Sequence, residues 1–205
     1  SIQKAGSAAS GSPDTKETKE NVPFQFKNRA DWLEKYMCAR YGLLPLNHPA
    51  YEYVNRLNSV YPKIKGKILI LAGCSDPNAV ALANGTILIS AGLLNFVKYE
   101  EELQFVLGHE RTHIQRHFGG KMEEEKSGRG SVDEFMVVIG KARLHEWEAD
   151  MRGVVEDMEK NGINPFGAKI FLQRNYIELE RGRGGGLVHG SSLDRMLNIS
   201  SMARF

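Results

Sequence analysis

The chain has 205 residues, which corresponds to one domain or to one domain with a tail. It carries 27 Lys and Arg against 25 Asp and Glu, so its net charge is +2. This near balance argues against a dedicated nucleic-acid binder, which usually has a strongly basic face. No run of 18 apolar residues occurs, so we expect no transmembrane helix within the sequence. Two cysteines are too few for a disulfide scaffold or a cysteine-rich zinc site.

Residues 1–22 are rich in Ser, Gly, Lys and Glu and nearly lack large apolar side chains. Such a segment cannot offset its ordering entropy by burial, so it is predicted to be a disordered tail or linker. Residues 23–205 have a globular composition and are predicted to form a single domain. Because the chain begins with Ser1, we expect a processed or partial form that lacks its targeting segment. Any membrane association would then depend on N-terminal residues that are missing from this sequence.

The first half of the domain combines helices with short strands. Apolar spacing predicts helices over residues 31–41 and 49–61. Short apolar runs predict strands over residues 67–72, 78–83 and 86–90. The dipeptide Asn84-Gly85 between the last two runs is a strong hairpin signal. Three consecutive short strands predict a small, mostly antiparallel sheet.

The second half is predicted to be helical. Apolar periodicity and the Gly and Pro residues that bound it predict helices over residues 99–118, 132–160, 165–180 and 193–202. The fold class expected from this order is α+β, mostly helical, with a small three-stranded sheet or hairpin beside the 99–118 helix.

Residues 109–113 read His-Glu-Arg-Thr-His, which is the HExxH motif. On a helix, His109 and His113 project from the same face and can bind one metal ion. Glu110 lies about 100° round the helix, where it can reach a water on that metal and act as a general base. The helical wheel places all three beside the apolar stripe and places Arg111 on the far side.

Zinc requires a third protein ligand, and the HExxHxxGxxH arrangement does not supply it. Arg116 and Gly119 stand where that pattern has its glycine and its third histidine. His117 lies one turn beyond His113, which is too far to share a metal with His109. We therefore expect His117 to be a surface histidine or one that stands behind the ligands.

Glu146 is the better candidate for the third ligand. It lies on the next predicted helix and would complete a His2Glu zinc site with one open position for water. Asp150 shares its helical face at i+4 and is predicted to hydrogen-bond a ligand histidine and fix its orientation. Glu148 points elsewhere and is expected to be solvated.

The sequence resembles the HtpX, BepA and CAAX-prenyl-protease family of gluzincin metallopeptidases over about residues 50–200. The motifs that carry this resemblance are Leu93-Leu94, Glu101 to Leu103, Val106 to Glu110, His113, Glu146 to Gly153, Gly162 and Pro165. The resemblance implies a minimal gluzincin domain, endopeptidase activity, one zinc ion per chain, and a protein or peptide substrate. Periplasmic, lipoprotein and mitochondrial-type members are the most similar, which implies an extracytoplasmic location.

The resemblance also suggests further site residues. The segment Asn78-Ala79-Val80-Ala81 is similar to the family's edge strand, which implies a substrate-binding strand that pairs with an extended peptide. By spacing, His189 and Arg195 match a C-terminal His and Arg of many members, although Gly190 replaces the usual Pro. His189 would either donate to the oxyanion of the scissile carbonyl or occupy the open zinc position as a latch, which we favour. Arg195 would anchor the loop that carries His189 by binding a carboxylate.

Two functions from different classes remain open. The leading prediction is a zinc endopeptidase that acts on unfolded or extended segments, with Glu110 as the general base on zinc-bound water. The alternative is a chaperone-like assembly or quality-control factor that keeps its zinc but cleaves little. A phosphate site at the glycine-rich residues 181–186 is excluded, because they lack the Lys-Ser/Thr of a P-loop and follow a helix.

Overall fold

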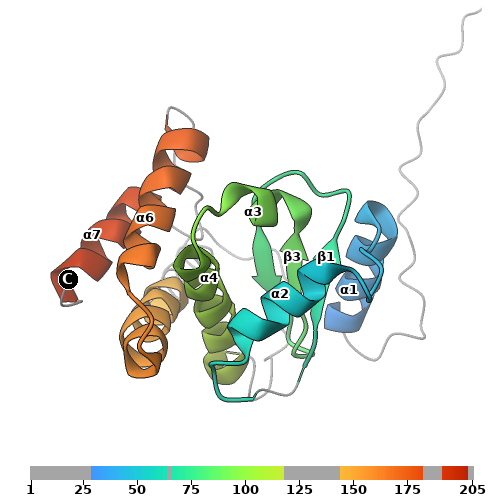
Figure 1. Ribbon diagram of the computed structural model, residues 1–205, viewed down its shortest axis with the longest axis horizontal. Coiled ribbons are helices and arrows are strands. Elements are labelled where there is room, and N and C mark those ends of the chain that lie inside the picture. Colours follow the sequence, from blue (N-terminus) through green and yellow to red (C-terminus); the bar gives the residue numbers. More distant parts are fainter. Residues whose placement is uncertain (1–28, 64–65, 118–143, 182–190, 203–205) are drawn as a thin grey trace, which may run out of the picture.

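The computed structural model describes residues 29–63, 66–117, 144–181 and 191–202 (Figure 1). Helices dominate, and a small three-stranded sheet lies beside the HExxH helix, which confirms the predicted α+β class. The tail predicted over residues 1–22 lies outside the described residues. Within the described ranges, no helix is both long and apolar enough to cross a membrane.

The first half of the chain follows the predicted order of elements. These elements are α1 (Arg29–Tyr41), α2 (Pro49–Asn58), β1 (Ile68–Leu71), β2 (Ala79–Ala81), β3 (Ile87–Ser90) and α3 (Ala91–Phe96). The short helix α3 was not predicted from the sequence. Its first turn is capped by Ser90, whose Oγ accepts a hydrogen bond from the Leu93 amide at 2.9 Å.

The sheet has the strand order β1-β3-β2, so β3 is central and β2 lies at an edge. The hairpin pair β2 and β3 is antiparallel, as the Asn84-Gly85 turn predicts, but β1 and β3 are parallel. The expectation of a mostly antiparallel sheet is therefore wrong. The reason is that β1 pairs not with the next strand in sequence but with β3, which runs in the same direction.

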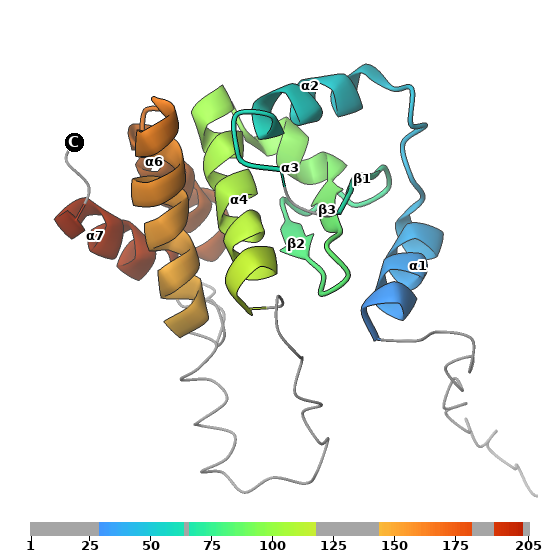
Figure 2. The same ribbon diagram turned by 90° about the horizontal axis from the view of Figure 1, so that it is seen from below.

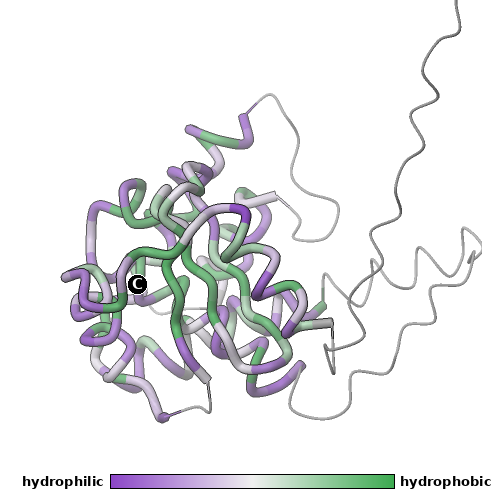
Figure 3. The backbone as a smooth tube through the Cα atoms, turned by 90° about the vertical axis from the view of Figure 1, so that its right-hand side faces the viewer, coloured by the Kyte–Doolittle hydropathy of each residue, from purple (hydrophilic) through white to green (hydrophobic). Residues whose placement is uncertain are grey.

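The sheet separates two apolar clusters, because alternate strand residues point to opposite faces. Ile70, Ile87 and Ile89 join the main core with α2 and α4 (Glu100–Thr112). Leu69 and Leu88 instead pack against α1 on the other face. Figure 2 shows α1 and α4 on opposite sides of the strands, and Figure 3 shows hydrophobic strands running side by side through the molecule.

The second half forms a helical layer against α4. Residues 144–151 are helical and continue through a π-helical stretch, Arg152–Met158, and a 3-10 turn, Glu159–Asn161. They are followed by α6 (Phe166–Asn175), a π-helical turn (Tyr176–Glu180) and α7 (Ser192–Met202). The helix predicted over residues 99–118 changes to a π-helical turn over His113–His117. Residues 118–143, which include the start of the helix predicted over 132–160, lie outside the described residues.

Two glycines allow α4 and the 144–161 segment to approach closely. A Cβ on Gly153 would lie 3.1 Å from the His109 backbone nitrogen, and one on Gly108 would lie 3.4 Å from the Gly153 Cα. A larger side chain at this crossing would push the two backbones apart. The glycines therefore set the separation between the helix that carries His109 and the helix that carries Glu146.

Arg111 departs from its predicted position on the polar side of α4. It is only 1% exposed, and its guanidinium lies over the Tyr61 ring at 5.2 Å. The guanidinium also donates to Asn58 Oδ1 at 3.1 Å and to the Pro62 carbonyl. The helical wheel fails here because α2 and the chain after it cover a face of α4 that would otherwise be solvent-exposed.

Candidate metal centre

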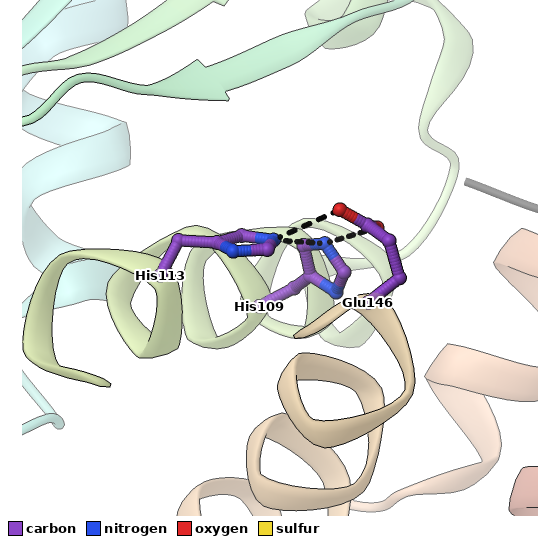
Figure 4. A group of neighbouring side chains, drawn as sticks. All are labelled: His109, His113 and Glu146. Atoms are coloured by element: carbon purple, nitrogen blue, oxygen red, sulfur yellow. Dashed lines mark hydrogen bonds and ion pairs between the residues drawn. The ribbon is translucent and has the colours of Figure 1, made fainter. Parts of the chain in front are cut away.

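Three predicted ligands meet at one point between two helices. His109 projects from α4, His113 projects from the π-helical turn that continues α4, and Glu146 projects from the neighbouring 144–151 helix (Figure 4). The two histidine Nε2 atoms are 3.1 Å apart, and each lies 3.2 Å from a Glu146 carboxylate oxygen. In a tetrahedral zinc site with ligand distances of 2.0–2.1 Å, ligand atoms are separated by about 3.3 Å. The three side chains therefore fit a zinc ion.

The orientation of His109 is fixed by Asp150. The Nδ1 atom of His109 lies 2.9 Å from Asp150 Oδ1, so a hydrogen on Nδ1 leaves the Nε2 lone pair facing the other ligands. Arg195 donates to both oxygens of Asp150, at 2.7 Å and 2.6 Å. Asp150 therefore contacts His109, one of the two histidines expected to bind metal, and Arg195 contacts the Asp150 carboxylate.

This buried network shifts the ionisation of its members. Burial raises the pKa of Asp150, but the charge and hydrogen bonds of Arg195, together with His109, outweigh it and hold that pKa at about 2. Burial lowers the pKa of His109, but hydrogen bonds with Asp150 and Glu146 bring it to about 9. Because a metal binds only the neutral imidazole, protons compete with metal for this nitrogen at neutral pH.

Glu110 lies next to the three candidate ligands and is not one of them. It is 8% exposed, and its Oε2 accepts a hydrogen bond of 2.6 Å from the Ala81 amide of β2. Burial raises the pKa of Glu110 above its ordinary value, against the opposing positive charges of His109 and His113. A carboxylate with a raised pKa is better suited to accept a proton near neutral pH.

The predicted substrate strand lies at the open edge of the sheet and contacts α4. Asn78 accepts a backbone hydrogen bond from Ser90, and Leu82 donates one to Thr86 just before β3. By the alternation of an antiparallel pair, Ala79 and Ala81 therefore direct their polar groups to the open edge. The Ala81 amide already binds Glu110. The remaining edge groups of these two alanines face the space beside the site.

A cavity of about 220 Å³ adjoins Glu110 and His109. Its apolar wall comes from α3, α4 and α6 and consists of Leu93, Phe105, Val106 and Phe171. Its polar rim includes Asn78, Asn175, Glu180 and Arg195. Sequence reasoning did not predict this cavity, because its walls come from elements whose packing only the tertiary structure defines.

Other site residues were missed or cannot be placed. His189 lies outside the described residues. His117 was expected at the surface or behind the ligands; its side chain is 6% exposed and its Nδ1 lies 2.9 Å from His113 Nδ1. Glu148, expected to be solvated, lies 3.1 Å from the other nitrogen of His117. The i+4 spacing of His113 and His117 was the one sequence signal for this contact.

Comparison with known proteins agrees with this geometry. Residues 57–128 match the sequence model of Peptidase family M48, a segment that contains the HExxH motif and ends before Glu146. The chain is also 30% identical over 187 residues to the mitochondrial metalloendopeptidase OMA1 of Schizosaccharomyces pombe. That similarity covers 75% of this chain and 53% of the relative, so the chain spans about half the length of the relative.

Proposed function

Because residues 57–128 match the model of peptidase family M48, we propose that this chain is a zinc-dependent endopeptidase that hydrolyses unfolded or extended protein segments. The observation that carries the proposal is the convergence of His109 Nε2, His113 Nε2 and the Glu146 carboxylate, whose two oxygens each lie 3.2 Å from one of these nitrogens, with Glu110 beside them. Zinc held by these residues would polarise the scissile carbonyl and lower the pKa of a bound water.

Glu110 supplies the base in this mechanism. Its carboxylate takes a proton from the attacking water and then delivers it to the amine that leaves when the peptide bond breaks. The hydrogen bond from Ala81 holds one carboxylate oxygen in place, so the other oxygen is the one that handles the proton. Asp150 and Arg195 keep His109 oriented throughout.

The open edge of β2 supports the proposed substrate class. An extended peptide can add to this edge as a further strand and hydrogen-bond the edge-facing groups of Ala79 and the carbonyl of Ala81, since the Ala81 amide already binds Glu110. The small side chains of both alanines leave room for a neighbouring backbone. The adjacent cavity, with its wall of Leu93, Phe105 and Val106, is sized for one apolar side chain of that peptide.

A folded segment cannot offer a free strand, so the edge predicts a strong preference for unfolded chains. The test compares cleavage of a stable globular protein with cleavage of its reduced, unfolded form. Equal rates would contradict binding at the β2 edge.

Metal removal tests the activity itself. Dialysis against a strong chelator should abolish cleavage of a casein-like substrate, and one equivalent of zinc should restore it. Restoration by magnesium but not by zinc would contradict the ligand set, because magnesium prefers oxygen ligands in octahedral geometry.

The alternative function is a chaperone-like assembly or quality-control factor that holds zinc and cleaves little. Unlike the endopeptidase, it would protect an unfolded protein from aggregation while leaving the chain intact. Electrophoresis of the substrate after incubation distinguishes the two functions.

His189 and the cellular location are further parts of the proposal. With zinc content held equal, a faster His189→Ala variant supports the latch, and a variant at least tenfold slower supports oxyanion stabilisation.

The mitochondrial name of the relative supports an organellar or other extracytoplasmic location. Imaging of the tagged full-length precursor tests that location.

A further inference from the structure

His117 stands directly behind the ligand His113. The two Nδ1 atoms are 2.9 Å apart and the ring centroids are 5.0 Å apart. The Nε2 atom of His113 points the other way, toward His109 and Glu146. His117 therefore contacts the one nitrogen of His113 that a metal ion would leave available.

The His117 ring is itself held on two further sides. Its Nε2 lies 3.1 Å from Glu148 Oε2, and the other oxygen of Glu148 accepts a 2.7 Å hydrogen bond from Arg152 Nε. The ring stacks on His145, with centroids 4.0 Å apart and planes 17° from parallel. With its side chain only 6% exposed, His117 has little freedom to turn away from His113.

Metal binding allows one arrangement of hydrogens along the row of contacts from His113 through His117 to Glu148. A His113 that offers its Nε2 lone pair to a metal carries its hydrogen on Nδ1. Among the described residues, that hydrogen faces His117 Nδ1; when His117 Nδ1 accepts it, the hydrogen of His117 lies on Nε2 and faces the Glu148 carboxylate. Each contact then has one donor and one acceptor.

We propose that His117 is a positioning residue for the metal centre, which orients His113 through Nδ1 and connects it to the carboxylate of Glu148. The two ligand histidines are thus supported in parallel ways. Asp150 holds His109 directly, whereas Glu148 holds His113 through the intervening imidazole of His117. This role rests on the proposed function, because it requires that His109, His113 and Glu146 bind zinc.

The test is zinc affinity, measured by competition with a chromophoric chelator. His117→Phe keeps a flat ring for stacking but removes both nitrogens, so zinc affinity should fall 10–100-fold, as for other residues that orient metal ligands. His117→Asn is the matched variant, because its amide oxygen falls near the position of Nδ1 and can still accept from His113. Its affinity should lie between those of His117→Phe and wild type, because the amide replaces the acceptor for His113 but does not reach Glu148.

Cobalt substitution gives a second readout that loss of packing alone would not move. The visible absorption bands of Co²⁺ report the geometry of its ligands, and they should shift in His117→Phe and return in His117→Asn. His48→Ala is the control: it removes a histidine that caps α2 on an exposed surface, so it lowers stability without touching the metal centre. Its zinc affinity and cobalt spectrum should match those of wild type.

Each outcome decides one claim. If wild-type protein binds no zinc, the proposed function is wrong, and the role of His117 falls with it. If wild type binds zinc and His117→Phe binds it equally tightly with an unchanged cobalt spectrum, only the positioning role is wrong. If His117→Phe does not fold, Glu148→Ala serves as the test variant, because the Glu148 side chain is 33% exposed and its removal disturbs the fold less. An unchanged zinc affinity in Glu148→Ala would then overturn the proposal.

Discussion

The carboxylate of Glu110 accepts a hydrogen bond of 2.6 Å from the backbone amide of Ala81. This contact ties the proposed general base, on α4, to the edge strand β2 that we propose receives the substrate. A peptide seated on that edge would therefore lie beside the carboxylate that handles the proton. This hydrogen bond between a helix and a strand would help to set the placement of the base relative to the substrate.

We expect Glu110→Gln to fold and to retain zinc but to lose nearly all hydrolysis. The amide oxygen of Gln can still accept from Ala81, but the amide cannot take a proton from water. Loss of a general base typically lowers the rate by 10²–10⁴-fold, or about 3–5 kcal/mol of barrier. Cleavage of a casein-like substrate at equal zinc content measures this, and an undiminished rate would show that another group is the base.

Glu146→Ala should bind zinc far more weakly than wild type, because it removes one of three protein ligands. Freshly purified wild-type protein should contain close to one zinc ion per chain, and the variant should contain little. Glu159→Ala is the matched control, since Glu159 is exposed in the same helical segment. Equal zinc content in Glu146→Ala and wild type would mean that the third ligand is a different residue.

Gly153→Val should weaken both the fold and the metal centre. A Cβ at this position already comes within 3.1 Å of the His109 backbone nitrogen, so the larger side chain must separate α4 from the helix that carries Glu146. Overpacking of this kind costs about 1–3 kcal/mol of unfolding free energy. Gly153→Ala should lie between wild type and Gly153→Val in both urea unfolding and zinc affinity.

The control for this series is Glu159→Val, which places the same branched side chain at an exposed position. It measures the cost of β-branching in a helical segment by itself. A Gly153→Val protein with wild-type zinc affinity would show that the helix separation does not control the metal centre.

Glu34→Gln should lower stability at neutral pH and lose this effect in acid. Glu34 joins α1 to the sheet by accepting from Asn84 at 2.9 Å and Thr86 at 2.7 Å and by pairing with Lys67 at 2.5 Å. Burial raises the pKa of Glu34, but these hydrogen bonds lower it by more than burial raises it. The pKa of Glu34 therefore lies below its ordinary value of 4.5. The stabilisation is then fully present above about pH 4.5 and lost as the pH falls through the folded-state pKa.

Urea unfolding at about pH 7 and about pH 3.5 measures this dependence. Removing the charge of Glu34 should cost about 1.5–3 kcal/mol of unfolding free energy at the higher pH, the usual range for hydrogen bonds to a charged group. The difference from wild type should shrink at the lower pH. Glu52→Gln, on the exposed side of α2, should show neither effect, and a pH-independent difference for Glu34→Gln would contradict the assigned pKa direction.

The sequence by itself predicted the α+β class, the helix that carries His109 and His113, and the face of the following helix that carries Glu146 and Asp150. These predictions depend on local periodicity, because i and i+4 side chains share a helical face wherever the helix lies. The Asn84-Gly85 hairpin is local in the same sense, and it places β2 antiparallel to β3. Short-range patterns of this kind can be predicted from residues that are close together in the sequence.

Only the tertiary structure decided the other contacts between helices and strands. The parallel pairing of β1 with β3, the burial of Arg111 under α2, and the contact of Glu148 with His117 all join residues that are far apart in the chain. The close approach at Gly153 belongs to the same class, because the sequence shows a glycine but not the backbone that crosses it. Such contacts depend on how helices and strands pack together, which the periodicity of a single element does not encode.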